Sequence, residues 1–164
     1  MRIDEFDTAP ADTARTLLRP CADVPSWVDA LTAERPFGSV DALLARADEL
    51  ARSWGADELS AALAHHPRIG ERPSGDTADA ELSRGEQASL GDADADVDAA
   101  IALGNAAYEE HFGRVFLIRA AGRTRPEVLA ELRRRLDLDP ADELACAVDQ
   151  LRQIALLRIE GTFA

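Results

Sequence analysis

Two short stretches of the chain carry residue types that could perform acid–base chemistry. Residues 65–70 read His-His-Pro-Arg-Ile-Gly and hold two of the three histidines. Residues 83–87 read Ser-Arg-Gly-Glu-Gln and hold one carboxylate, Glu86. An imidazole, with an ordinary pKa of about 6.5, can give or take a proton near neutral pH. We therefore expect His66 and Glu86 to face one pocket that does proton chemistry on a small anionic molecule.

Helical periodicity separates the two adjacent histidines. Leu59, Leu63 and His66 fall on one face of a predicted helix, whereas His65 points about 100° away from His66. Pro67 disfavours the helical conformation for His66 and should end the helix there. This pattern predicts His65 at the surface and His66 at the buried rim of a helix end. A core histidine bonded to a backbone carbonyl is the alternative interpretation of His66.

Glu86 has two interpretations that the residues leave open. The spacing Ser83-x-x-Glu86 is that of a capping box, in which the carboxylate accepts from a backbone amide at a helix start. The same helix start could instead bind an anion through its free amides, with Ser83, Glu86 and Gln87 facing it. Both interpretations predict a short helix over 83–90, after a stretch from Pro67 to Leu82 without regular structure.

Several other kinds of chemistry find no support in the sequence. Adjacent histidines on a helix diverge and no Cys-x-x-Cys spacing exists, so we expect no metal site. His111 lies on an apolar helix face near the helix end, which favours a packing or capping role. Every basic residue is arginine, which excludes a lysine Schiff base and a Walker-type phosphate loop. Cys21 and Cys146 are interpreted as two reduced thiols.

The length and net charge of the chain limit the number of domains and the classes of binding partner. A chain of 164 residues is most simply one domain over residues 1–164. The formal net charge of −13 repels nucleic acids and anionic lipids. No apolar run approaches ~20 residues, and the first residues lack the apolar centre of a secretory signal. We expect a cytoplasmic protein that binds neither nucleic acid nor membrane.

The predicted elements are almost all helical, since alanine, leucine, arginine and glutamate dominate. The fold class expected is an all-α single-domain bundle of several helices with one extended apolar segment at Val115–Ile118. The expected helices cover residues 10–20, 26–34, 39–54, 57–66, 83–90, 95–112, 124–136 and 140–160. In the last of these, Arg158 shares the apolar face of Leu144 and Leu151. A charge in that position needs an anion, from a protein carboxylate or from a ligand.

Four motifs in order resemble one known family. They are the stretch 65–70, Ser83-x-x-Glu86-Gln87, the run Asn105-x-x-Tyr108-x-x-x-Phe112-Gly113-x-x-Phe116-x-Ile118, and Leu156-Leu157-Arg158. Together they resemble 2-oxo-4-hydroxy-4-carboxy-5-ureidoimidazoline (OHCU) decarboxylases, along nearly the whole chain. The resemblance implies an all-helical homodimer that uses no metal or organic cofactor. It also implies the reaction, which is loss of carbon dioxide from the ureidoimidazoline to give (S)-allantoin in urate breakdown.

The resemblance also implies roles for individual residues. His66 is the acid–base group, with Glu86 as its catalytic companion holding the ureido nitrogens and Arg158 as the cation for the substrate's charge. Arg68-Ile69 replaces an acidic residue and leucine found in many members. The substrate-binding residues implied are Pro67, Ser83, Arg84, Gly85, Glu86, Gln87, Phe116, Ile118, Arg119, Ala120, Ala121, Gly122 and Arg158.

Two other classes of function compete with the decarboxylase. A non-catalytic helical module could use the same pocket to bind a purine-derived anion, and a helical hydrolase could act on a related ureido compound. Stereospecific formation of allantoin from the ureidoimidazoline distinguishes the decarboxylase from both.

Overall fold

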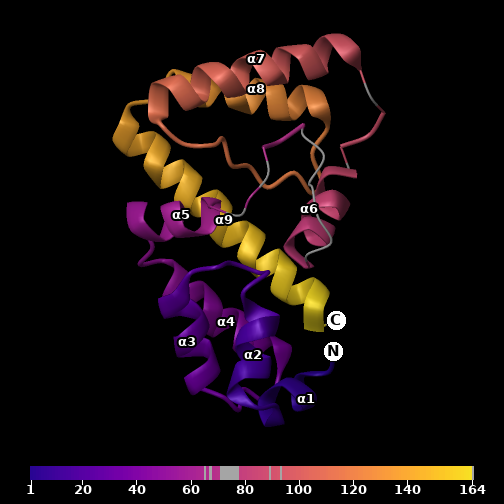
Figure 1. The fold of residues 1–164 in the computed structure, drawn as a ribbon, viewed down its shortest axis with the longest axis vertical. Helices are drawn as coiled ribbons and strands as arrows, with labels where there is room; N and C mark the ends of the chain where they lie inside the picture. Colours follow the sequence, from indigo (N-terminus) through magenta and orange to yellow (C-terminus); the bar gives the residue numbers. More distant parts are fainter. Residues whose placement is uncertain (65, 67, 71–77, 89, 93, 164) are drawn as a thin grey trace. The chain divides into compact units, whose positions relative to one another are not determined.

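A computed structural model describes residues 1–64, 66, 68–70, 78–88, 90–92 and 94–163, with the side chain of Asp79 excepted. All regular structure within these ranges is α-helical, which confirms the predicted all-α class. In chain order the helices are α1 (Ile3–Thr8), α2 (Ala11–Leu18), α3 (Pro25–Ala33), α4 (Val40–Ala51), α5 (Ala56–Leu63), α6 (Ala78–Ala88), α7 (Ala95–Phe112), α8 (Arg125–Leu136) and α9 (Pro140–Phe163) (Figure 1).

The chain divides into two compact units. Unit 1 comprises Met1–Ala62 and Arg152–Ala164, and unit 2 comprises Leu63–Leu151. The first half of α9 therefore belongs to unit 2 and the second half to unit 1. One domain over 1–164 stays a prediction. Within the described residues, no helix combines the length and apolar character needed to cross a membrane.

Local signals in the sequence explain several helix ends. Ser39 caps α4 by accepting from the amide of Ala42 at 3.1 Å. Thr124 and Glu127 form the predicted capping box of α8. Gly113 ends α7 with φ of 69°, a left-handed conformation that glycine adopts without strain, and its N–H donates to the last turn. The predictions of α7 and α8 are confirmed.

The prediction for the region before Ser83 was wrong. Helix α6 begins at Ala78, so Ser83 lies in the middle of the helix rather than at its start. Both interpretations of a helix start at Ser83 fail, because the backbone amides there belong to the helix interior. The residues from Ala78 to Leu82 include alanine, glutamate and leucine, which are strong helix formers. Helix α1 was also not predicted, and α5 ends at Leu63, before His66.

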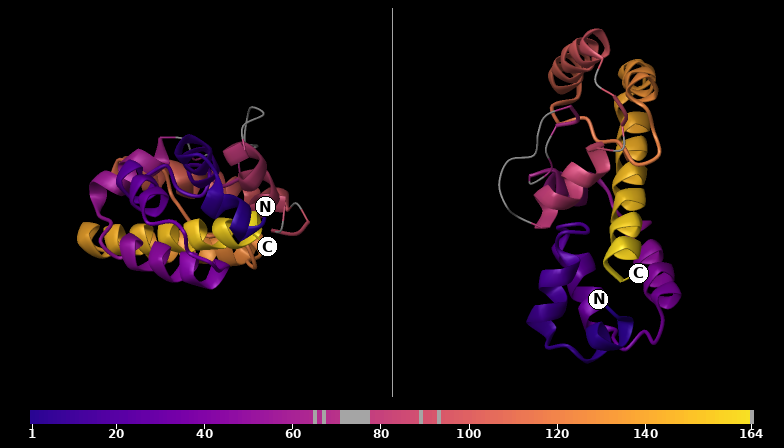
Figure 2. Two further views of the ribbon diagram at one scale, coloured as in Figure 1. Left: turned by 90° about the horizontal axis from the view of Figure 1, so that it is seen from below. Right: turned by 90° about the vertical axis from the view of Figure 1, so that its right-hand side faces the viewer.

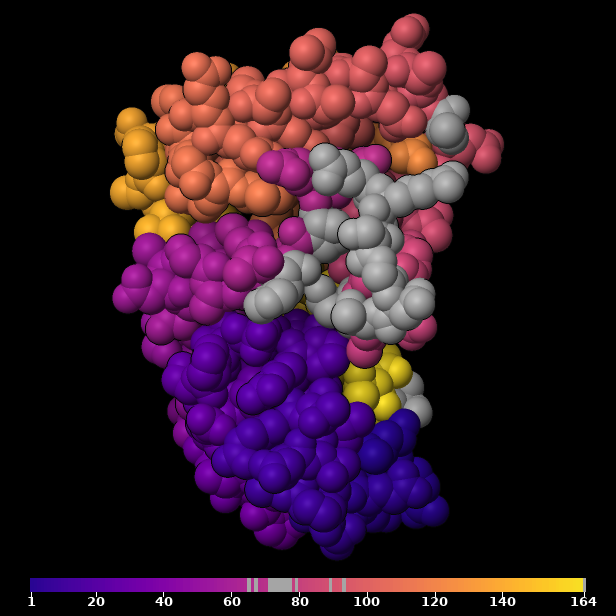
Figure 3. All heavy atoms as spheres, viewed as in Figure 1, coloured from indigo at the N-terminus to yellow at the C-terminus, as the bar shows by residue number. Residues whose placement is uncertain are grey.

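Unit 1 is organised around two aromatic pairs. Phe6 and Phe163 meet edge to face with ring centroids 4.9 Å apart, and Trp27 and Trp54 do the same at 5.7 Å. The indole N–H of Trp27 donates to the carbonyl of Ala47 at 3.0 Å, so this buried ring leaves no polar atom unsatisfied. The space-filling view shows the indigo and purple residues of this unit closely packed over the visible face (Figure 3).

Unit 2 has its own apolar core between α7, α8 and the segment that joins them. Helices α7 and α8 lie side by side, with Gly104 of α7 facing the buried Leu132 of α8 (Figures 1 and 2). A Cβ at residue 104 would come within 2.5 Å of Leu132, so glycine permits this close approach. Phe116, Leu117 and Ile118 are buried without forming a strand, as predicted for the extended segment.

Candidate active site

His66 lies three residues beyond the end of α5. Its backbone N–H donates to the carbonyl of Leu63 at 3.2 Å. The residue is half-buried, and its ring nitrogen Nε2 is shielded from solvent. A shielded ring nitrogen suits a group that exchanges a proton with a bound molecule rather than with bulk water. His65 and Pro67 lie outside the described residues.

Gln87 joins the second stretch to the backbone that follows His66. Its Oε1 accepts from the N–H of Gly70 at 3.1 Å, and its Nε2 donates to the carbonyl of Arg68 at 3.4 Å. Gly70 adopts φ of +87°, which glycine tolerates and most residues do not. The side-chain amide therefore brackets residues 68–70, and the two stretches singled out in the sequence come together through it.

Helix α7 holds the same loop from another side. Nδ2 of Asn105 donates to the carbonyl of Ile69 at 2.9 Å, and Asn105 is 7% exposed. Arg68 donates through Nε and Nη2 to Glu109 at 2.5 and 3.0 Å. These hydrogen bonds and the charge of Arg68 lower the pKa of Glu109. Between residues 68–70 and α7 lies a pocket of about 320 Å³.

The other residues of the second stretch occupy different environments along α6. Ser83 is buried at 3% exposure, Glu86 is half-buried, and Arg84 and Gly85 are exposed. A Cβ at Gly85 would meet no atom of the described residues within 4 Å.

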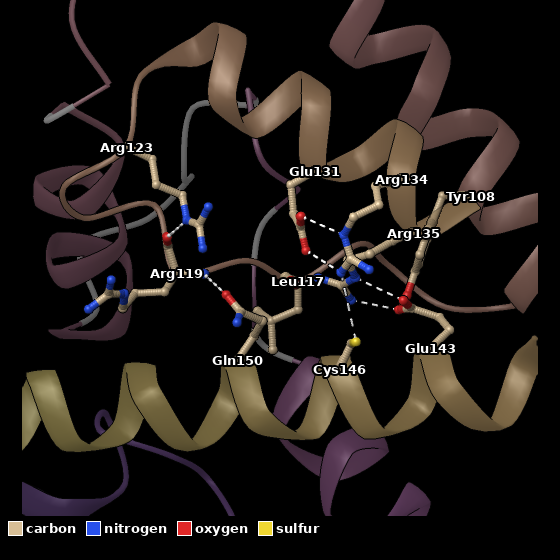
Figure 4. Close-up of polar contacts among 10 residues, drawn as sticks. All are labelled: Tyr108, Leu117, Arg119, Arg123, Glu131, Arg134, Arg135, Glu143, Cys146 and Gln150. Atoms are coloured by element: carbon tan, nitrogen blue, oxygen red, sulfur yellow. Dashed lines mark hydrogen bonds and ion pairs between the residues drawn. The ribbon is translucent and has the colours of Figure 1, made fainter. Parts of the chain in front are cut away.

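The predicted second binding segment, 118–122, is fixed by side chains from other helices. The N–H of Arg119 donates to Oε1 of Gln150 on α9 at 3.0 Å. The carbonyl of Arg119 accepts from Nε of Arg123 at 3.2 Å. Figure 4 shows Gln150 reaching from α9 to this backbone. Both polar backbone groups of Arg119 are consequently used within the protein.

A buried ionic cluster anchors the start of that segment. Arg135 of α8 donates through Nε and Nη2 to the carboxylate of Glu143 at 2.8 and 2.6 Å. Its Nη1 donates to the carbonyl of Leu117 at 2.7 Å, and its guanidinium lies 4.6 Å from the ring centroid of Phe116. Tyr108 donates to the same carboxylate (Figure 4). One arginine thus ties α8 and α9 to the segment that precedes residue 118.

Electrostatics within this cluster favour its present ionisation state. Burial raises the pKa of Tyr108 to about 12, and its hydrogen bond to Glu143 acts in the same direction. Burial alone would lower the pKa of Arg135, but the hydrogen bonds and the charge of Glu143 outweigh it and raise the pKa. Arg114 adds a second cation, 3.7 Å from Glu143. The two side chains of the Arg135–Glu143 pair are fully buried.

The apolar core shared by these elements explains how the predicted residues come together. One cluster of buried side chains contains Ile69, which follows His66, and Leu90, which follows α6. It also contains Phe116, Ile118 and Ala120 of the second segment. The loop after His66, the end of α6 and the segment 116–120 therefore pack on a common core. Ala121 is half-buried and Gly122 exposed beside them.

Arg158 is not part of this group in unit 2. It lies in unit 1, is 2% exposed, and its Nη1 donates to the carbonyl of Pro20 at 2.7 Å. The carbonyl of Pro20 therefore provides one of the partners that this buried charge needs. Its contact with a substrate stays a prediction.

Three further predictions concern a metal site, the two cysteines and His111. Among the described residues, no group of three His, Cys, Asp or Glu side chains could hold a metal ion. Neither Cys21 nor Cys146 forms a disulfide, as predicted. His111 is exposed and meets Phe112 edge to face at 4.4 Å, so its prediction on an apolar face was wrong although its packing role is confirmed.

Sequence reasoning missed four positioning residues: Asn105, Arg135, Glu143 and Gln150. Two of them carried a detectable signal. Arg135 follows Val128 and Leu132 at helical spacing on the apolar face of α8, and Glu143 takes the corresponding place on α9 before Ala147. Opposite charges on the apolar faces of two helices indicate a buried pair. Asn105 and Gln150 carried no such signal.

Comparison with known proteins gives a consistent result. The model of the OHCU decarboxylase family matches residues 7–160. The chain is 32% identical over 133 residues to the 2-oxo-4-hydroxy-4-carboxy-5-ureidoimidazoline decarboxylase of Amia calva, covering 80% of this chain and 76% of that protein. It is 34% identical over 137 residues to the mouse (Mus musculus) protein of the same name, covering 79% and 74% of the two chains.

Solved structures agree on the fold. An OHCU decarboxylase crystallised in the presence of (S)-allantoin superimposes with a TM-score of 0.77 at 24% identity, covering 90% of this chain and 97% of that one. An (S)-allantoin synthase gives a TM-score of 0.71 at 18% identity, covering 99% and 54%. From the family match and the relatives, the chain belongs to the OHCU decarboxylase family.

Proposed function

We propose that this protein decarboxylates 2-oxo-4-hydroxy-4-carboxy-5-ureidoimidazoline to (S)-allantoin in urate breakdown, without metal or organic cofactor. Family membership supports the reaction. The observation that carries the assignment to a site is the contact of Gln87 with residues 68–70. It joins the helix of Ser83 and Glu86 to the backbone directly after His66. The proposed proton-transfer residue and the polar face of α6 are therefore connected through Gln87.

The chemistry of the substrate defines what the site must do. The bond to the carboxylate carbon breaks and carbon dioxide leaves. The bonding electron pair forms a C=C bond to the ureido-bearing carbon, while the C=N electron pair moves onto the nitrogen, which takes up a proton. The resulting enol loses its hydroxyl proton to become a carbonyl, and the ureido-bearing carbon gains a proton on one face. A single enantiomer forms only when one group delivers that proton from a fixed position. His66 is the proposed donor, and it also polarises the neighbouring hydroxyl.

The other residues orient the substrate in this proposal. Glu86 accepts from the ureido N–H groups, and Ser83 and Arg84 contribute further polar contacts with Pro67 beside His66. Phe116 forms the apolar wall. Because Gln150 and Arg123 already use the N–H and carbonyl of Arg119, we assign contact with the heterocycle to the other backbone groups of residues 118–122. Arg158 balances negative charge.

The test uses freshly generated ureidoimidazoline and follows the circular dichroism of allantoin against the spontaneous reaction. The wild-type protein should form the (S) enantiomer faster than the background. His66→Asn should fold normally and lose most of this activity. His111→Asn is the matched control, since His111 is exposed and touches only the neighbouring Phe112 ring in the described contacts. It should keep wild-type turnover.

Other outcomes would reassign the protein. Racemic allantoin at the spontaneous rate, with the substrate still bound, would favour the non-catalytic binding module. Release of ammonia or opening of a ureido group would favour a hydrolase. Full activity in His66→Asn would remove that residue from the mechanism while leaving the reaction intact.

We also propose that the protein acts in the cytoplasm as a homodimer, on the basis of the family resemblance. Light scattering of the purified protein should give twice the 17.7 kDa of one chain. A mass of one chain at micromolar concentration would contradict the dimer. Fractionation of the source cells, with detection by antibody, tests the compartment.

A further inference from the structure

Arg119 has no acidic partner within 4 Å among the described residues, unlike several other arginines of unit 2. Arg68, Arg125 and Arg134 each lie within 4 Å of a carboxylate, at Glu109, Asp98 and Glu131 respectively. No residue in the described ranges forms an ion pair with Arg119. Its Nε is shielded from solvent and finds no acceptor among those residues. In a chain with 31 acidic and 18 basic residues, a buried guanidinium N–H without an acceptor is unusual, and among the described residues only Arg114, which lies 3.7 Å from Glu143, shares this feature.

The backbone of Arg119 is held from both sides. Its N–H and carbonyl bind Gln150 and Arg123, and the adjacent Ile118 and Ala120 are each only 5% exposed. The direction in which the side chain leaves the backbone is therefore fixed. Figure 4 shows it extending away from Gln150 and from the cluster around Glu143. Because the backbone is held in place, less conformational entropy is lost when the side chain binds an anion.

We propose that the guanidinium of Arg119 binds the carboxylate of the substrate. This inference rests on the proposed function, and it gives the side chain a role beyond the backbone contacts expected of residues 118–122. A buried N–H without an acceptor is unfavourable, and a carboxylate satisfies it with a charge-assisted hydrogen bond. Arg123, bonded to the same backbone, adds positive charge at this segment.

The chemistry of the reaction makes this role specific. The carboxylate is present in the substrate and absent from the product, which is uncharged. Arg119 therefore favours binding of the substrate over retention of the product. Because the interaction is made in the bound substrate and weakens as carbon dioxide leaves, its loss should raise KM more than it lowers kcat.

The test compares two small probes that differ only in charge. N-carbamoylglycine carries a ureido group and a carboxylate, and N-carbamoylglycinamide carries the same ureido group with a neutral carboxamide in place of the carboxylate. Their dissociation constants are measured by calorimetry on the full chain. The wild-type protein should bind the carboxylate more tightly. Arg119→Gln should weaken that binding roughly 10- to 100-fold, the ratio expected for one charge-assisted hydrogen bond, and leave the amide unchanged.

Two further variants make the result decisive. Arg119→Lys keeps the charge and should recover part of the affinity for the carboxylate. Arg133→Gln removes an equal charge from an exposed position on α8 and should bind both probes like the wild type. Equal affinity of the wild-type protein for the two probes, or equal weakening of both by Arg119→Gln, would overturn the role of Arg119.

Failure of the proposed function can be told apart from failure of this inference. The probe measurements need no turnover, so a carboxylate preference that depends on Arg119 stands even when no allantoin forms. Conversely, stereospecific turnover that depends on His66, with an unchanged KM in Arg119→Gln, would support the reaction and refute the role of Arg119.

Discussion

The side-chain amide of Asn105 donates a 2.9 Å hydrogen bond to the carbonyl of Ile69, three residues after His66. Its Oδ1 is buried and has no hydrogen-bond partner within the described residues. A buried acceptor left unsatisfied destabilises a fold by about 1–3 kcal/mol. We therefore infer that Asn105 serves to hold the loop of residues 68–70 and thereby helps to position His66.

Replacing Asn105 by leucine should therefore lower turnover more than stability. The substitution fills similar volume on α7 and removes both the donor and the unsatisfied acceptor. We expect kcat to fall between about 10- and 100-fold, since a misplacement of about 1 Å can have that effect. Stereospecific allantoin formation measures kcat, and urea unfolding measures stability.

Glu109→Gln, which breaks only the half-exposed ion pair with Arg68, serves as the control and should change stability by less than about 1 kcal/mol. Wild-type kcat in Asn105→Leu would show that the tie is dispensable.

Gly85→Ala tests whether a ligand approaches the open face of α6. Within the part of the chain that the structure describes, no atom lies within 4 Å of a Cβ at this position, and alanine is favoured over glycine in a helix by about 0.5–1 kcal/mol. The melting temperature should therefore stay level or rise, while KM for the ureidoimidazoline rises. Gly161→Ala, equally unobstructed on α9, should leave KM unchanged. An unaltered KM in Gly85→Ala would mean that the substrate does not lie against this residue.

The pair of Arg135 and Glu143 should be sensitive to removal of one partner. Glu143→Gln leaves a fully buried guanidinium without its counter-charge, and we expect a loss of about 3–5 kcal/mol in the free energy of unfolding. Urea denaturation measures the loss. Glu131→Gln affects the more exposed pair with Arg134 and should lose less than about 1 kcal/mol. Replacing both Arg135 and Glu143 by methionine and leucine should be less damaging than the single change; a larger loss would contradict this account.

The raised pKa of Tyr108 predicts how the stability of the folded protein changes at alkaline pH. Burial and the hydrogen bond to Glu143 raise the pKa of Tyr108 to about 12, against about 10 in an unfolded chain. Between these values the folded state keeps a proton that the unfolded state has lost, so stability falls as pH rises from 10 to 12 and is fully present below 10. Tyr108 is the only tyrosine and the chain has no lysine, so few other groups titrate there. Absorbance at 295 nm should show phenolate forming near pH 12 in the native protein. A midpoint near pH 10 in native buffer would exclude the raised pKa.

Local patterns accounted for most of the fold. The limits of α7 and α8 follow from Gly113 and from the Thr124–Glu127 capping box, signals contained within a few residues of each helix end. The start of α6 was missed because Gly70, Pro73 and Gly75 indicated an irregular connection as far as Leu82. The alanine, glutamate and leucine residues from Ala78 onward favour a helix, and this preference outweighs the effect of the preceding glycine and proline residues.

The site was less accessible from the sequence because its supports are non-local. Gln87 meets Gly70 across 17 residues, and Asn105 meets Ile69 across 36. Helical periodicity distinguished His66 from His65. No periodicity in the sequence, however, predicts a hydrogen bond between a loop carbonyl and a side-chain amide on a later helix. The Arg135–Glu143 pair was recoverable in principle, since each charge interrupts an apolar face. Gln150 was not, because a half-exposed glutamine is ordinary on any helix.

The attachment of residues 68–70 to later helices has a consequence for how the protein is made. During synthesis the histidine emerges first, and the two groups that hold the adjacent backbone follow only with α6 and α7. Unit 1 likewise lacks its share of α9 until residues 152–163 have been made. The contacts that hold residues 68–70 are complete only once α7 has been made, before α8 and α9. Termination of synthesis before residue 105 therefore yields a fragment that contains His66 and the whole of α6 but lacks the contact from Asn105.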